Sequence, residues 1–354
     1  MSEQNGRFDR AAALKWLGAA AAGGALSGAF GADAHAAPAS FLRPHPHWRF
    51  VFVNHATTNP FFVPTKYGIQ DACSLLGARY EWTGSRSSSV GEMVKAMRRA
   101  IKSHAAGIAV SLIEPEAFNR ATAEALAKGV PVVSYNADGG RGNQRLAYIG
   151  QDLYESGLRF GARIAHLVQG GDVFLFIATP GQLNIQPRID GARDAIRDSG
   201  KPIRVHVVAT GPDLRRERAL IERTYRENRR LRGMFAVDGG STQGVAEVMR
   251  KYRLHKKGVK AGGYDLLVGT LRAIGDGHLD FTIDQQPYLQ GFVPLLQLFF
   301  VQYTGGLISP ADTNTGVVFV TRRNLAPYVT TFTRYEGSSY LQKYPVGSYP
   351  VSPS

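Results

Sequence analysis

Residues 48–76 read WRFVFVNHATTNPFFVPTKYGIQDACSLL and contain the pattern that decides the fold. The short apolar run at residues 48–53 predicts a buried β-strand, and the periodic segment at residues 64–76 predicts a helix. Between them lies the loop TTNPFFV, residues 57–63, which places two adjacent phenylalanines beside an asparagine. The stretch therefore predicts a βα unit with a polar and aromatic loop at the carboxyl end of its strand.

The same alternation of apolar runs and amphipathic segments continues along the chain. Such a rhythm is typical of βα units that share a parallel sheet. It runs to about residue 135, restarts near residue 155 and ends near residue 325, which predicts an α/β protein with two successive halves of similar size. The further predicted strands are ARYEWTG, GIAVSLI and PVVSYNA in the first half, and DVFLFIA, IRVHVVAT, GMFAVD, VKAGGYD, LDFTIDQ and TGVVFVT in the second.

Polar and aromatic side chains follow several of these strands, at the edge where open parallel sheets bind ligands. Aspartate and asparagine exchange hydrogen bonds with hydroxyl groups, and an aromatic face covers the C–H side of a sugar ring. We therefore expect a site for a small polyhydroxylated ligand, with Phe61 and Phe62 as a stacking platform. For any single aspartate, capping of the next helix explains the position equally well, and a lone loop phenylalanine is more often a core anchor. The residues at strand ends are Asn59, Phe61, Phe62, Glu114, Asn136, Asp138, Asp238, Asp265, Asp284 and Gln285.

Three of these segments resemble one known family, the periplasmic sugar-binding proteins of ABC importers, of the ribose-binding type. The segments are TNPFFVPTKYGIQDA, PVVSYNAD and FTIDQQPYLQGF, and the likeness covers residues 48–325. The resemblance implies two Rossmann-like αβ lobes with parallel sheets, joined by a three-strand hinge that closes on ligand. It implies a first lobe of residues 47–150 and 286–315, a second lobe of 151–285 and 316–325, and a carboxyl-terminal extension of 326–354.

The resemblance also implies which residues bind the ligand. Asn136 is followed by Ala137 where ribose binders have an aspartate and an arginine, and Asp238 replaces an asparagine; these departures argue against ribose itself. The acidic residues disfavour an acidic ligand such as a uronate. Pentoses, hexoses, sugar alcohols and cyclitols stay open, as does the question of whether His55 enters the site. The implied ligand-binding residues are Asn59, Phe61, Phe62, Glu114, Asn136, Arg188, Asp238, Tyr264, Asp265 and Gln285.

Composition and motifs argue against other classes of function. The formal net charge is +14, but the basic residues are scattered, which disfavours a nucleic-acid partner. The sequence shows no nucleophile elbow, metalloprotease motif, phosphate loop or metal-ligand spacing, so we expect no catalysis, no cofactor and no metal. Repressors that share this fold begin with a helix-turn-helix segment that reads DNA. In this chain the same position has the layout of an export signal, which argues against a repressor.

The first 36 residues have the layout of an export signal. Three basic residues precede an alanine-rich run that ends in Ala34-His35-Ala36, a small-x-small cleavage pattern. The stretch FDRAAALKWLG resembles a twin-arginine signal with only Arg10 in the arginine pair's place, so the export route stays open. The single cysteine, Cys73, lies far from the signal and cannot form a disulfide within the chain. We expect a soluble periplasmic protein cleaved near Ala36.

These observations predict a solute-binding protein that captures a small sugar or polyol and delivers it to an ABC permease in the inner membrane. We expect a monomer that performs no chemistry on its ligand. The alternative is a sensor that presents the bound ligand to a chemoreceptor or a sensor kinase, which would use the same site.

Overall fold

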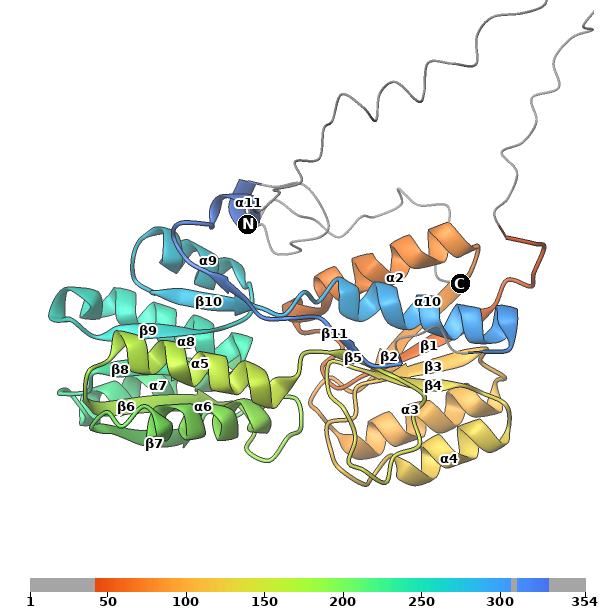
Figure 1. Cartoon of the computed structure of the whole chain (residues 1–354), viewed down its shortest axis with the longest axis horizontal. Helices are drawn as coiled ribbons and strands as arrows, with labels where there is room; N and C mark the ends of the chain where they lie inside the picture. The colour runs from red at the N-terminus through yellow and green to blue at the C-terminus, as the bar shows by residue number, and fades with distance from the viewer. Residues whose placement is uncertain (1–41, 307–310, 331–354) are drawn as a thin grey trace, which may run out of the picture. The chain divides into compact units, whose positions relative to one another are not determined.

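The computed structural model describes residues 42–306 and 311–330. The predicted export signal lies outside these ranges, and so does most of the predicted carboxyl-terminal extension. The described residues from His45 onward belong to one compact unit. Their strands form two six-stranded sheets with helices on both faces, which confirms the predicted α/β fold of two lobes (Figure 1).

The first lobe is built on a fully parallel sheet of order β11-β5-β4-β3-β1-β2. Two helices that lie side by side, α2 and α10, cover one face, and α3 and α4 cover the other. The strands are β1 (Arg49–Asn54), β2 (Arg79–Gly84), β3 (Gly107–Val110), β4 (Val132–Tyr135), β5 (Tyr148–Gly150) and β11 (Thr313–Asn314). The helices are the short 3-10 helix η1 (Pro60–Phe62), α2 (Val63–Leu76), α3 (Val90–Lys102), α4 (Asn119–Ala127) and α10 (Leu289–Thr304).

The second lobe is built on a sheet of order β12-β10-β9-β8-β6-β7, in which only β12 runs antiparallel to its neighbour. Helices α5 and α6 cover one face, and α7, α8 and α9 cover the other. The strands are β6 (Gly171–Ile177), β7 (Ile203–Ala209), β8 (Gly233–Ala236), β9 (Lys260–Tyr264), β10 (Phe281–Asp284) and β12 (Val318–Val320). The helices are α5 (Leu153–Leu167), α6 (Gln186–Asp198), α7 (Leu214–Glu227), α8 (Gly239–Lys251), η2 (Leu254–Lys257), α9 (Val268–Gly275) and α11 (Ala326–Thr330).

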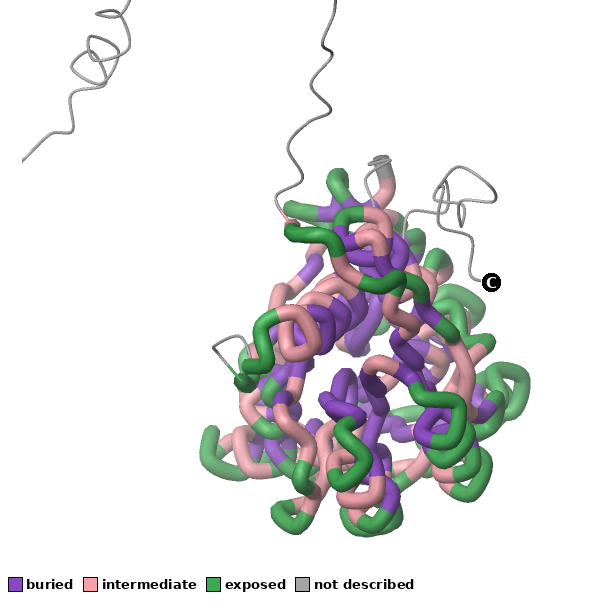
Figure 2. The backbone as a smooth tube through the Cα atoms, turned by 90° about the vertical axis from the view of Figure 1, so that its right-hand side faces the viewer, coloured by how far each residue is buried: buried purple, intermediate pink, exposed green. Residues whose placement is uncertain are grey.

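Alternating side chains of the central strands supply the core on both faces of each sheet. In β6, Phe174 and Phe176 pack toward α7 and α8, whereas Val173 and Leu175 pack toward α5 and α6. Both faces are apolar because helices cover both, as expected for a parallel sheet. Figure 2 shows this arrangement as buried segments inside and exposed turns outside.

The chain passes between the two sheets three times: after β5, after β10, and between β11 and β12. Side-chain amides join these crossing segments. Gln286 donates to the carbonyl of Thr315 at 2.9 Å, and Gln151 donates to the carbonyl of Gly316 at 2.9 Å. The Thr315 hydroxyl in turn donates to the carbonyl of Gln285 at 2.8 Å. The three connections therefore form one hydrogen-bonded strap rather than three independent linkers.

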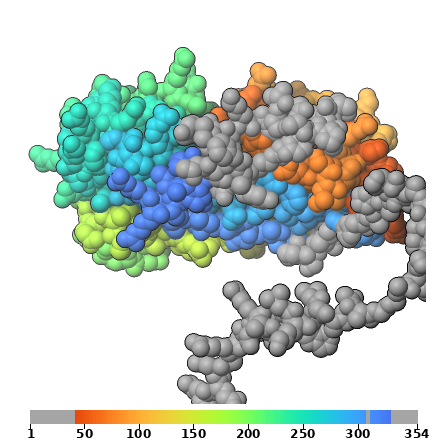
Figure 3. Space-filling view, turned by 90° about the horizontal axis from the view of Figure 1, so that it is seen from above, coloured from red at the N-terminus to blue at the C-terminus, as the bar shows by residue number. Residues whose placement is uncertain are grey.

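The described carboxyl-terminal residues return to the second lobe. Leu325 and Tyr328 are buried in the same core cluster as Leu271 and Ile274 of α9, and Figure 3 shows this segment in dark blue against that lobe. The beginning of the predicted extension thus forms helix α11, which Tyr328 anchors in this core. None of the helices in the described ranges has the length and apolar character that a membrane span requires.

Candidate ligand-binding site

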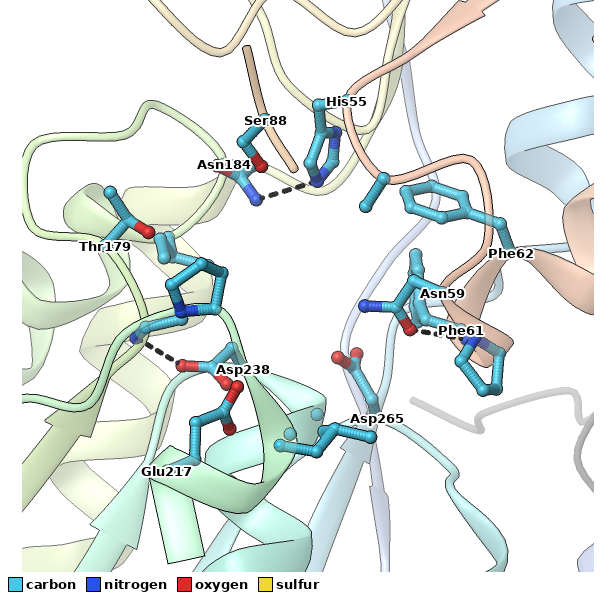
Figure 4. A pocket seen from close by; sticks show the side chains of 18 of the residues that line it. His55, Asn59, Phe61, Phe62, Ser88, Thr179, Asn184, Glu217, Asp238 and Asp265 are labelled. Atoms are coloured by element: carbon cyan, nitrogen blue, oxygen red, sulfur yellow. Dashed lines mark hydrogen bonds between the residues drawn. The ribbon is translucent and has the colours of Figure 1, made fainter. Parts of the chain in front are cut away.

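A cavity of about 580 Å³ opens between the lobes, at the carboxyl ends of their strands (Figure 4). Eight of the ten predicted site residues line it. They are Asn59, Phe61, Phe62, Asn136, Arg188, Asp238, Asp265 and Gln285.

The loop after β1 forms the aromatic side of the cavity. The Asn59 side-chain oxygen caps η1 by accepting from the backbone N–H of Phe61 at 3.0 Å, which leaves the amide nitrogen facing the cavity. Phe62 is only 2% exposed and packs edge-to-face on Phe61, with ring centroids 4.7 Å apart. Phe61 is half-buried and lies nearer the surface. Both rings line the cavity, and Phe61 keeps more exposed surface than Phe62.

His55 lies between this loop and the second lobe. Its Nδ1 pairs with the hydroxyl of Ser111 at 2.9 Å, and its Nε2 meets the amide of Asn184 in the second lobe at 3.4 Å. Burial lowers the pKa of His55 to about 4, so the neutral ring can accept from the amide. Nearby, the backbone N–H of Leu183 donates to the carbonyl of Ile113 at 3.0 Å. Both contacts join the lobes directly at one side of the cavity.

Arg188 of α6 is the buried cation of the site, at 2% exposure. Its two terminal nitrogens donate to the carbonyl of Val237 at 2.9 Å and to the Gln151 side chain at 3.1 Å. Its Nε has no hydrogen-bond partner in the structure. The guanidinium lies 4.1 Å above the ring of Tyr264. A buried guanidinium with a free donor is suited to binding hydroxyl oxygens.

Tyr264 itself does not line the cavity, contrary to the prediction. Its ring lies beneath Arg188, and its hydroxyl pairs with Ser156 at 2.8 Å. Successive side chains of a strand point to opposite faces, so Tyr264 enters the core while Asp265, the next residue, reaches the cavity.

A chain of hydrogen bonds links Asp265 to the first lobe. Gln285 donates to Asp265 at 2.6 Å, Gln290 donates to Gln285 at 3.3 Å, and Asn136 donates to Gln290 at 3.1 Å. The side-chain oxygen of Asn136 remains without a partner although it is buried. Asn136 and Asp265 both have left-handed backbones, with φ of 66° and 74°, a costly conformation that often occurs at functional sites.

Burial raises the pKa of Asp265 to about 6. The positive charge of Arg188 and the hydrogen bond from Gln285 act in the opposite direction and limit the rise. Asp265 is therefore mostly ionised near neutral pH and can accept hydrogen bonds from hydroxyl groups.

Asp238 both caps a helix and lines the cavity, which are the two alternatives that the sequence left open. One carboxylate oxygen caps α8 by accepting from the N–H of Ser241 at 2.8 Å, and the other accepts from the N–H of Ala178 at 2.8 Å. The carboxylate nevertheless lines the cavity and points toward Glu217 (Figure 4). Helix capping and a place in the site do not exclude each other here.

Glu114 is the second predicted residue that the structure places outside the cavity. Its carboxylate accepts from the backbone N–H groups of Glu116 at 3.0 Å and of Ala117, within the turn that precedes α4. These local hydrogen bonds turn the Glu114 side chain back onto its own backbone. Asp138 is likewise engaged elsewhere, in an ion pair with Arg145.

The sequence analysis missed residues that follow β2, β6 and β7. They obey the same carboxyl-end rule, but they lie in polar loops and in a charge-rich helix that looked solvated. They include Arg86, Ser87, Ser88, Thr179, Gln182, Asn184, Arg215 and Glu217. His55, which the sequence left open, also lines the cavity.

Two α/β lobes that enclose a polar and aromatic cavity define a two-lobed solute-binding protein. The chain belongs to the periplasmic binding protein domain family, whose pattern matches residues 50–300. This confirms the family that the sequence resemblance indicated. Among the described residues, no group of three or more metal-ligating side chains is placed to hold a metal ion.

One curated relative is the xylose/arabinose-binding protein XylF of Sulfolobus acidocaldarius. It is 50% identical over 313 residues, which cover 84% of this chain and 77% of the relative.

Two solved structures are similar in fold and, more distantly, in sequence. A solute-binding protein of an ABC transporter from Burkholderia graminis C4D1M, in complex with D-arabinose, is 25% identical with a TM-score of 0.75; the match covers 81% of this chain and 99% of that one. AraP, an arabinose-binding protein from Geobacillus stearothermophilus, is 26% identical with a TM-score of 0.66, covering 79% and 98%.

Proposed function

We propose that this protein captures a small neutral sugar, with the pentoses xylose and arabinose as first candidates, and delivers it to an ABC permease. The observation that carries this proposal is the cavity itself, with the Phe61 ring on one side and hydrogen-bonding groups on the other. Sugars need both, because one face of the ring is rich in C–H groups and the rim carries hydroxyls. The xylose/arabinose-binding relative supports pentoses as the first candidates.

In this proposal the eight cavity residues of the predicted set have distinct roles. Phe61 stacks on the sugar, supported by Phe62. Asn59, Asn136 and Gln285 exchange hydrogen bonds with hydroxyl groups, since amides both donate and accept. Arg188 donates through its free Nε, and Asp238 and Asp265 accept. The unpartnered atoms on Arg188 and Asn136 support these roles, because buried polar groups are rarely left unsatisfied.

The capture step is a hinge closure. We propose that residues 47–150 with 286–315 move against residues 151–285 with 316–325, and that the crossing strap is the hinge. A ligand favours the closed form only through contacts that it makes better there than in the open form. The contact between His55 and Asn184 supports this view, since it joins the two lobes beside the cavity.

The proposal places the protein in the periplasm as a monomer, after removal of the export signal. No nucleic acid is a partner, and the ligand leaves chemically unchanged. Membership of a solute-binding family supports these statements.

The first test is a thermal-shift screen of the mature protein from residue 37, followed by calorimetry of any hit. The panel contains xylose, arabinose, ribose, galactose, myo-inositol and glucuronate. A ligand that binds only the native state raises the melting temperature by mass action, and we expect the largest rise with a pentose. A folded sample that responds to none of these sugars would contradict the proposal. If sugar binds but uptake does not depend on the permease, the sensor alternative replaces delivery.

A further inference from the structure

Glu217 is a buried acid whose carboxyl group has a side-chain hydrogen bond with Ser241. It lies in the first turn of α7, whose other charged side chains are mostly exposed, yet it is only 3% exposed. Its carboxyl group lines the ligand cavity and points toward Asp238 (Figure 4). Its Oε2 atom has no hydrogen-bond partner in the structure. An unsatisfied buried oxygen in a carboxyl group that lines a cavity indicates a missing partner.

The packing around Glu217 leaves room for its carboxyl group. A Cβ atom at Gly240, in the first turn of α8, would lie only 2.7 Å from Glu217 Oε1. Any larger residue at position 240 would therefore displace the carboxyl group. The glycine at position 240 thus leaves the space that the carboxyl group occupies.

The charges around Glu217 favour its protonated form. No salt bridge in the described ranges includes Glu217, and its nearest charged neighbour in the cavity is the like-charged Asp238. Burial raises the pKa of Asp238, whereas two backbone N–H bonds and the charge of Arg188 act in the opposite direction. Burial, and then the charge of Asp238, raise the pKa of Glu217 to about 8. We assign the proton of this pair to Glu217, because Asp238 is the carboxylate that accepts two backbone N–H bonds.

We propose that Glu217 is a ligand-recognising residue whose protonated carboxyl group donates a hydrogen bond to an oxygen atom of a neutral sugar. The proposal rests on the proposed sugar-binding function and extends its site to the loop and helix after β7. A protonated carboxyl group has one donor, which complements the acceptors Asp238 and Asp265 in the same cavity. An ionised Glu217 beside Asp238 would instead prefer an amine.

The other titratable and charged groups of the cavity do not produce the same pH dependence. Asp213, the cap of α7, adds to the rise in the pKa of Glu217 by its charge. Asp265 has its own pKa raised to about 6, two units lower. His55 has a pKa lowered to about 4, and the basic side chains of the cavity are Arg86, Arg188 and Arg215. A loss of affinity between pH 7 and 9 therefore reports on the pair Glu217 and Asp238, and the Glu217→Gln variant tests whether Glu217 carries it.

The test is calorimetric titration with xylose and arabinose from pH 5.5 to pH 9.5. For the full-length mature protein we expect the dissociation constant to rise about tenfold between pH 7 and pH 9, because only the protonated acid donates. Glu217→Gln keeps a donor without a charge, so we expect weaker binding at pH 7 but no change between pH 7 and pH 9. Glu217→Ala removes the donor, and we expect at least tenfold weaker binding at pH 7.

Glu227→Gln is the matched control, since Glu227 lies on the same helix, is 57% exposed and pairs only with Arg223. It should follow the wild-type profile. Parallel profiles for wild type and Glu217→Gln would overturn the proposal, and so would binding of glucosamine that exceeds binding of glucose and strengthens with rising pH. If neither pentose binds the folded wild type at any pH, the proposed function fails, and the role of Glu217 fails with it.

Discussion

The two sides of the cavity are built from different chemistry. The first lobe contributes mainly neutral groups: the Phe61 ring, the Asn59 amide and the neutral His55, with Arg86 as its only charged cavity residue. The second lobe contributes the buried ions and acids of the site, among them Arg188, Asp238, Glu217 and Asp265. Removing neutral and aromatic groups from water costs much less free energy than removing charges. Buried charges therefore need partners in fixed positions. Under the proposed function, we therefore expect the first side to shape the binding position and the second side to set which hydroxyl pattern is accepted.

Replacing Arg188 should have the largest effect on binding and therefore tests this comparison first. Arg188→Met keeps much of the side-chain length but removes every donor, so we expect at least a hundredfold weaker sugar binding. The free energy of unfolding should also fall by about 2–4 kcal/mol, because Val237 and Gln151 lose a buried partner. Calorimetry and urea unfolding measure the two effects.

The control for Arg188 is Arg197→Ala on the same helix, since Arg197 is 68% exposed. It should leave both quantities nearly unchanged. A variant at position 188 that binds sugar normally would show that the second side does not set ligand choice.

The next largest effect is expected at Phe61. Phe61→Ala removes the stacking surface, and we expect about tenfold weaker binding, which corresponds to about 1.4 kcal/mol. Calorimetry measures the affinity, and thermal unfolding should show little change because the ring is only half-buried.

Phe62→Ala provides the contrast, with an expected loss of about 3–5 kcal/mol in the free energy of unfolding. If Phe61→Ala destabilised the fold as much as Phe62→Ala, both rings would be core anchors, and the first side would offer no platform.

A smaller effect is expected from the titration of Asp265. Its pKa is raised to about 6, so the carboxylate that we propose as an acceptor for the sugar is present above that pH and is lost as the pH falls through it. We expect the dissociation constant to rise about fourfold between pH 7.5 and pH 5.5. In Asp265→Asn this rise in the dissociation constant at low pH should disappear, and the affinity should be lower at every pH. If the dissociation constant of that variant still rose at low pH, the titration would belong to another group.

The smallest effect is expected at Glu114. Glu114→Gln alters a turn outside the cavity, so affinity should stay within the error of calorimetry. The free energy of unfolding should fall by less than about 1 kcal/mol, as for other local cap bonds. A clear loss of affinity would place the residue in the ligand site of the closed form.

The sequence predicts most of the fold because its elements have local signatures. The run at residues 48–53 becomes β1, and the amphipathic segment after it becomes α2, in both cases within about one residue. The site is predicted less completely. The rule that ligands bind at the carboxyl ends of strands identifies positions in the sequence, but not the direction in which each side chain points. Tyr264 follows the rule in sequence but points into the core beneath Arg188.

Glu217 shows the other limit of the sequence. It lies in LRRERALIERTYRENRR, a run so charged that it predicts a solvated helix. Its burial arises because α8 presents a glycine and Asp238 to it, from positions more than 20 residues away. No local pattern contains that information.

Cys73 gives the protein a practical advantage. It is the only cysteine in the chain and is fully buried in α2. Burial also raises the pKa of its thiol. We therefore expect it not to react with thiol reagents while the protein is folded. A cysteine introduced at Ser87 or Gln182, one on each side of the cavity, would then be the sole site for a fluorescent dye. Such a labelled protein would act as an optical sensor that reports sugar concentration directly, without any further change to the native thiol.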